Sequence, residues 1–186
     1  MNAFRGAALA LLALGPLLAT GARAEPPVAA GYVDGAMFRA LVDDDREIVE
    51  VNLEGPLLQS MAKSKGEDSD DKDTNELFGK LKAIHAVIGT VKGPASAAMN
   101  LVHQTDQKLV AAGWQRVARI KDESTMISVL THTAGGHVDG LVALIFDSDD
   151  KELVFANLAG EIDITRLGEI GERVHVPGLD QIPGAR

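Results

Sequence analysis

The chain has 186 residues, of which 24% are charged and none is cysteine, and its formal net charge is −9. Without cysteine it can form no disulfide and offers no thiol nucleophile or thiolate metal ligand. The acidic excess argues against binding to nucleic acid or anionic lipid, which requires clustered Lys and Arg.

Residues 1–24 have the pattern of a secretory signal peptide. Arg5 gives a positive start, Gly6 to Leu18 is apolar, and Ala22-Arg23-Ala24 matches the small-x-small cleavage pattern. The apolar stretch of about 12 residues is short beside the roughly 20 that a membrane-spanning helix needs. We therefore predict cleavage after Ala24 and no membrane span afterwards; the alternative is an uncleaved membrane anchor.

The predicted mature chain begins at Glu25 and is more acidic than its precursor. Loss of Arg5 and Arg23 leaves 16 basic against 27 acidic side chains, a formal charge of −11. A lipoprotein carries its lipid on a cysteine at the cleavage site, and this chain has none. We expect a periplasmic or secreted protein with a single domain over residues 25–175.

The first half of this domain alternates short helices and strands. Residues 25–34 are rich in Pro, Ala and Gly and predict a loose leader, and Ala36–Val42 predicts a short amphipathic helix. Glu47–Glu54 alternates apolar and polar residues, which predicts a strand with one dry and one wet face. Gly55-Pro56 indicates a helix start. Residues 64–74 predict an acidic, flexible loop.

The second half predicts a long helix among further strands. Ile84–Val91 is the next expected strand, followed by a helix that starts at Gly93-Pro94 and stops at Gly113. Four more strands are then expected, with Gly160 leading into a final helix that Asp163 caps, and with an irregular tail over 176–186. These strands are Trp114–Ile120, Met126–His132, His137–Phe146 and Glu152–Leu158.

These elements predict an α+β fold. We expect a mostly antiparallel sheet of about six strands, with one polar face and with the helices packed mainly on one face. The strand His137–Phe146 carries apolar residues on both of its sides, so we place it in the centre of the sheet.

Several segments resemble a bacterial family called domain of unknown function 4252. They are Tyr32-Val33-Asp34, Glu50-Val51-Asn52-Leu53, Ala112-Gly113-Trp114 and Phe155-Ala156-Asn157-Leu158-Ala159-Gly160-Glu161-Ile162-Asp163. The resemblance would cover residues 32–171. It implies a small exported protein without an assigned reaction, and it carries over no functional residues. Many members look like lipoproteins, from which this cysteine-free chain departs.

One local group of side chains could bind a metal. His132 and His137 flank a four-residue turn, and Asp139 follows two residues later, so imidazole and carboxylate groups could meet across a hairpin. A zinc site needs three or four ligands, and exposed histidines often lie at hairpin ends. These residues are therefore low-priority metal candidates, and we expect no cofactor.

The sequence lacks the motifs of a calcium loop, a nucleophilic active site and a phosphate-binding loop. The acidic stretch around Asp71 has Glu76 where a calcium loop needs Gly and Lys82 where it needs a carboxylate. No nucleophile elbow or phosphate-binding loop is present. No catalytic residue is predicted.

Three functions stay open on the sequence. The first is a non-enzymatic periplasmic interaction or binding module whose contact surface is the wet face with Glu50, Asn52 and Glu54; an ordinary solvated face is the plainer interpretation of these residues. The second is a metal-dependent hydrolase that uses His132 and His137. The third is an envelope signalling accessory that binds a membrane regulator through an exposed strand edge. In each binding case the partner would be another envelope protein.

Overall fold

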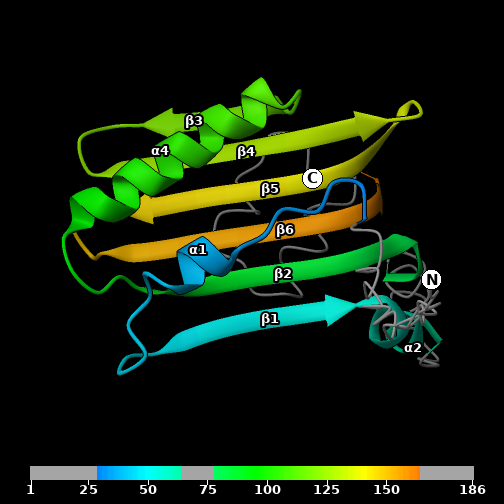
Figure 1. The fold of residues 1–186 in the computed structure, drawn as a ribbon, viewed down its shortest axis with the longest axis horizontal. Coiled ribbons are helices and arrows are strands. Elements are labelled where there is room, and N and C mark those ends of the chain that lie inside the picture. Colours follow the sequence, from blue (N-terminus) through cyan, green and yellow to red (C-terminus); the bar gives the residue numbers. More distant parts are fainter. Residues whose placement is uncertain (1–28, 64–77, 164–186) are drawn as a thin grey trace, which may run out of the picture.

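The computed structural model describes residues 29–63 and 78–163 of the chain (Figure 1). The predicted signal peptide, acidic loop, final helix and C-terminal tail lie outside these residues. None of the described helices is long and apolar enough to cross a membrane.

Six strands and three labelled helices make up the described part. The helices are α1 (Ala36–Arg39), α2 (Gly55–Lys63) and α4 (Ala95–Ala111). The strands are β1 (Ile48–Glu54), β2 (Leu81–Thr90), β3 (Gln115–Lys121), β4 (Thr125–Ala134), β5 (His137–Asp147) and β6 (Glu152–Ile162).

The strands form one sheet in the order β1-β2-β6-β5-β4-β3, and every neighbouring pair is antiparallel. This arrangement confirms the predicted α+β fold with a mostly antiparallel sheet. β5 and β6 lie inside the sheet, and nearly all their residues from Asp139 to Phe146 and from Leu153 to Ala159 are buried or half-buried. The apolar residues on both sides of β5 therefore indicated its interior position correctly.

Helices α1 and α4 lie over one face of the sheet (Figure 1). Phe38 of α1 stacks on Phe155 of β6, with ring centroids 4.7 Å apart and planes 13° from parallel. Ala98, Val102 and Leu109 of α4 join the same buried cluster, which spreads over β2, β6, β5 and β4. We call this side of the sheet the α4 face. Burial of this apolar stripe is what holds α4 against the sheet.

An ion pair between buried Asp106 and partly exposed Arg116 also fastens α4 to the sheet. Asp106 is 0% exposed, and both its oxygens accept hydrogen bonds from Arg116 of β3, at 2.9 and 2.5 Å. The hydroxyl of Ser128 on β4 donates to the same carboxylate at 2.5 Å. Burial raises the pKa of Asp106, but the bonds from Arg116 and Ser128 outweigh it and hold the pKa below its ordinary value.

The opposite face of the sheet is also apolar, which corrects the prediction of one polar face. Ile84, Ala143, Val154 and Ala156 are each at most 4% exposed, and Leu58 of α2 joins their cluster. The error has a simple origin: the alternation that predicted a wet face belongs to β1, an outer strand, whereas the inner strands are apolar on both sides.

Strand β6 is longer than the predicted Glu152–Leu158 and runs through Gly160, which was expected to end the strand and lead into the final helix. The strand continues to Ile162, and Gly160 pairs with Leu81 beside an irregularity in β2. Gly160 has φ 133°, and a Cβ there would lie 2.6 Å from the carbonyl oxygen of Lys80. Glycine at this position therefore permits a close approach of two strands rather than a strand-to-helix turn.

Candidate functional site

The leader before α1 is fastened across the α4 face by one buried side chain. The backbone N–H of Val33 donates to Oδ1 of Asn157 at 2.9 Å, and Nδ2 of Asn157 donates to the carbonyl of Gly31 at 2.9 Å. The same amide nitrogen donates to the carbonyl of Leu141 at 3.0 Å. Asn157 is 0% exposed, so these bonds also satisfy its buried amide. The predicted loose leader is wrong for this segment.

Two glycines let the leader pass close to β5. Gly31 has φ +80°, and a Cβ there would lie 2.0 Å from the carbonyl oxygen of Asp139. A Cβ on Gly140 would lie 2.5 Å from Cα of Gly31 and 2.8 Å from the Trp114 ring. The segments that carried the family resemblance, around residues 32, 114 and 157, therefore meet at one place on the α4 face.

A polar groove of about 220 Å³ lies between this leader, α1 and strands β1 and β2. Polar side chains come from all four elements, while Phe155 and Val87 contribute apolar wall. The lining residues are Tyr32, Asp34, Gly35, Ala36, Arg39, Glu50, Val51, Asn52, His85, Ala86, Val87 and Phe155. Asn52, His85 and Asn157 follow one another across β1, β2 and β6 in direct register.

Arg39 sets the charge at one end of the groove. Its Nε donates to Glu50 at 2.7 Å, and its Nη2 donates to Asp44 at 2.5 Å. The hydrogen bonds that Arg39 donates to Asp44 and Glu50 raise the pKa of Arg39, and the bond from Arg39 lowers the pKa of Asp44. One guanidinium therefore lies between two carboxylates at this end of the groove.

At the other end, His85 lies between an acid and an aromatic ring. Its Nε2 is 3.2 Å from a carboxylate oxygen of Glu54, and its ring meets Tyr32 edge-on with centroids 4.9 Å apart. Burial, with Asp34 and Glu54 nearby, raises the pKa of the Tyr32 hydroxyl. The hydroxyl is therefore protonated at neutral pH and can donate a hydrogen bond.

The structure joins the predicted contact surface to residues that the sequence did not single out. Glu50 and Asn52 line the groove, and Glu54 reaches it through His85. Tyr32, Arg39 and His85 were missed as groove residues because they come from separate segments. The quoted segment Tyr32-Val33-Asp34 was the one available signal for the leader.

The candidate metal ligands come together only in part. His132 Nδ1 and Asp139 Oδ1 lie 2.6 Å apart, and the His132 ring tilts against Trp114 with centroids 5.3 Å apart. His137 is exposed at the end of the β4–β5 hairpin. Over residues 29–63 and 78–163, no three His, Asp or Glu side chains are grouped so that they could hold a metal. Of the three candidate metal ligands, His132 and Asp139 are therefore in contact, and the His132–His137 pair of the hydrolase hypothesis is not among the contacts described.

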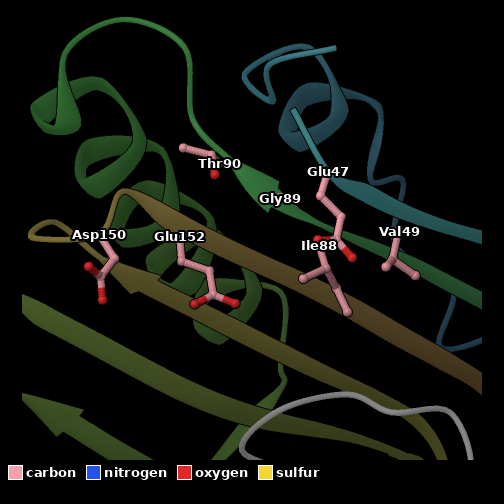
Figure 2. A pocket seen from close by; sticks show the side chains of 7 residues that line it. All are labelled: Glu47, Val49, Ile88, Gly89, Thr90, Asp150 and Glu152. Atoms are coloured by element: carbon pink, nitrogen blue, oxygen red, sulfur yellow. The ribbon is translucent and has the colours of Figure 1, made fainter. Parts of the chain in front are cut away.

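A second hollow of about 380 Å³ lies on the opposite side of β1 and β2 (Figure 2). It carries carboxylates from three places: Glu47 before β1, Asp150 in the β5–β6 turn and Glu152 at the start of β6. Val49, Ile88, Gly89 and Thr90 complete its lining. The three acids border the hollow without forming a metal-binding group among the described residues.

The fold and the groove together define a class: an α+β protein with a six-stranded antiparallel sheet and a leader fastened across its helix-covered face. The sequence pattern of the family described as "Domain of unknown function (DUF4252)" matches residues 40–170, so the chain belongs to that family. The match confirms the resemblance seen in the sequence and begins after Tyr32-Val33-Asp34. No curated protein matches the chain.

Proposed function

We propose that this protein is an exported, non-enzymatic binding module of the bacterial envelope, and that the polar groove is its contact surface. The observation that supports the proposal most is the assembly of the groove itself. Two residues of the predicted contact surface, Glu50 and Asn52, lie there with Tyr32, Arg39 and His85. Such a set of donors and acceptors on a rigid sheet edge suits recognition of a polar partner segment.

The charges favour a partner that brings a basic side chain. Asp34, Glu50 and Glu54 lie in or beside the groove, and among its lining residues Arg39 is the one Lys or Arg that opposes them. Opposite charge across an interface steers association and selects the partner. An envelope protein with an exposed Lys or Arg segment is therefore the expected partner.

A peptide titration tests the groove. We expect a lysine-rich peptide to shift the NMR signals of the Tyr32 and His85 rings, and a glutamate-rich peptide of equal length to leave them in place. Tyr32 is the single tyrosine of the chain, so its signals need no further assignment. The double variant Asp34→Asn/Glu50→Gln should weaken the shifts, whereas Glu123→Gln, an exposed change outside the groove, should not. Equal shifts of the Tyr32 and His85 signals with both peptides would contradict the proposal that the groove is the contact surface.

Export is tested separately by cell fractionation and intact mass measurement. The proposal predicts a periplasmic or secreted protein that begins at Glu25. A variant with Ala22 and Ala24 both changed to Asp should be retained as precursor, since signal peptidase requires small residues there. Recovery of wild-type protein in the cytoplasm with residues 1–24 intact would contradict the proposed export to the envelope.

A further inference from the structure

The sheet has two outer strands whose far sides pair with no described strand. β1 and β3 end the strand order, and each is seven residues long. Figure 1 shows no described element beside the outer side of either strand along most of its length. The outer N–H and C=O groups of such a strand can pair with a strand of another chain.

The outer strand β1 is acidic on the α4 face. Glu50 and Glu54 alternate there with Asn52, and their side chains are 53% and 63% exposed. Each carboxylate already has one partner, Arg39 or His85. A carboxylate has about four acceptor positions, so each can bind a further donor.

The outer strand β3 is basic on the same face. Arg119 pairs in register with Ser128 and Lys121 pairs with Met126. Ser128 bonds to Asp106 of α4, and Met126 belongs to the α4-face cluster, so both basic residues share that face. Arg119 and Lys121 are exposed.

The apolar residues of the two edges also lie on a common side. Ile120 pairs with Ile127 and projects to the face opposite α4, where it is 50% exposed. Val49 of β1 is 43% exposed and belongs to that same side of the sheet, since it alternates with Glu50. Each edge therefore presents a charged row on one face and an exposed apolar residue on the other.

We propose that the protein associates with further copies of itself, with β3 of one copy adding to β1 of the next. Five antiparallel steps separate β1 from β3, so the two strands run in opposite directions. A neighbouring copy placed beside the first in the same orientation thus continues the antiparallel sheet. When Lys121 is placed opposite Glu50, Arg119 lies opposite Asn52 and diagonal to both Glu50 and Glu54. In that register Ile120 lies opposite Val51 and diagonal to Val49. Opposite-charge and apolar cross-strand pairs stabilise such a ladder.

The charges also decide the symmetry of the assembly. Two β1 edges would bring four glutamates together, and two β3 edges would bring basic residues together, so each edge repels its own kind. A closed twofold dimer through either edge is therefore disfavoured. The remaining pairing is head-to-tail and leaves a free edge at each end, which produces an open row of copies. An irregularity between Arg116 and Ala118 confines regular pairing to the later half of β3.

Charge reversal tests the pairing by sedimentation velocity of the mature protein over a range of concentrations. Arg119→Glu/Lys121→Glu gives a chain with two acidic edges, and Glu50→Lys/Glu54→Lys gives one with two basic edges. We expect wild type to associate, each variant alone to associate at least about tenfold more weakly, and their equimolar mixture to regain association. Added salt should weaken the wild-type assembly.

The control Lys92→Glu/Lys108→Glu makes the same change in total charge as Arg119→Glu/Lys121→Glu, at exposed residues outside both outer strands, and should associate like wild type. Circular dichroism and melting temperature establish that each variant is folded. A wild type that is monomeric at its highest soluble concentration would overturn the proposal, as would association that survives both edge variants or a mixture that stays monomeric. Tyr32→Ala alters the groove alone, so its effect on peptide binding without an effect on assembly separates this proposal from the proposed function.

Discussion

Two polar contacts fasten segments of the chain to the α4 face of the sheet, and one of them is charged whereas the other is neutral. Near the β3 edge, Asp106 binds Arg116 and Ser128 and fastens α4. Over the middle of the sheet, the neutral amide of Asn157 binds backbone groups of Gly31 and Val33 and fastens the leader. Both polar residues are 0% exposed. The first contact thus joins an ionised carboxylate to a guanidinium and a hydroxyl, and the second joins a neutral side chain to backbone.

This difference predicts how the stability of the protein changes when each contact is removed. Removing the buried Asp106 carboxylate takes away three charge-assisted hydrogen bonds that join α4 to β3 and β4. Removing a neutral amide leaves unsatisfied backbone groups that water can reach once a short surface segment moves away. Loss of the charged contact should therefore weaken the whole domain, and loss of the neutral contact should release mainly the leader.

The largest expected effect comes from Asp106→Ala. This change removes the shared acceptor of three hydrogen bonds beneath α4, two from the partly exposed Arg116 guanidinium and one from the buried Ser128 hydroxyl, and we expect the free energy of unfolding to fall by about 3 kcal/mol. Urea denaturation followed by circular dichroism measures it. The exposed control Asp149→Ala should change stability by less than about 0.5 kcal/mol. Similar values for the two variants would show that the ion pair contributes little.

The next effect is that of Asn157→Ala. The change removes the acceptor for Val33 N–H and the donor for the Gly31 carbonyl, and we expect a loss of about 2 kcal/mol. Hydrogen exchange distinguishes it from the first variant, because the Val33 amide should lose protection while the amides of β5 keep theirs. Equal loss of protection throughout the sheet would contradict a local role for Asn157.

A smaller effect is expected for Ser128→Ala. It deletes one of three hydrogen bonds to Asp106 and leaves the two from Arg116, so we expect a loss of about 1 kcal/mol. In the double variant with Asp106→Ala, Ser128→Ala should cost less than it does alone, since its acceptor is already gone. Additive losses in that double-mutant cycle would show that the two side chains do not interact.

The two contacts also show what the sequence could and could not predict. Alternation and apolar runs depend on neighbours in the chain, and they predicted the strands and the interior position of β5. His132 and Asp139 are seven residues apart across one hairpin, so their approach could be anticipated. Asn157 and Val33 are 124 residues apart, and that bond depends on how the leader crosses the finished sheet. The groove beside it joins four elements and was therefore beyond prediction from local patterns.

The smallest effect is a difference in acid sensitivity that is absent at neutral pH. The pKa of folded Asp106 is held below its ordinary value of 3.8, so its carboxylate stabilises the fold above that value and this contribution is lost as pH falls through the folded pKa. In Asp106→Asn nothing titrates at this position. The free energy of unfolding, measured in urea at successive pH values below about 4, should therefore fall less steeply in the variant than in wild type.

Asp44 and Asp147 also have lowered pKa values and titrate in both proteins, so the difference between the two slopes isolates Asp106. Asn157 carries no ionisable group, and the Val33 amide should keep its protection in acid for as long as the domain stays folded. Parallel slopes for wild type and Asp106→Asn would mean that the carboxylate has the same pKa in the folded and unfolded chains. The contact under α4 would then stabilise the fold through packing and hydrogen bonds, and charge would no longer separate it from the contact at Asn157.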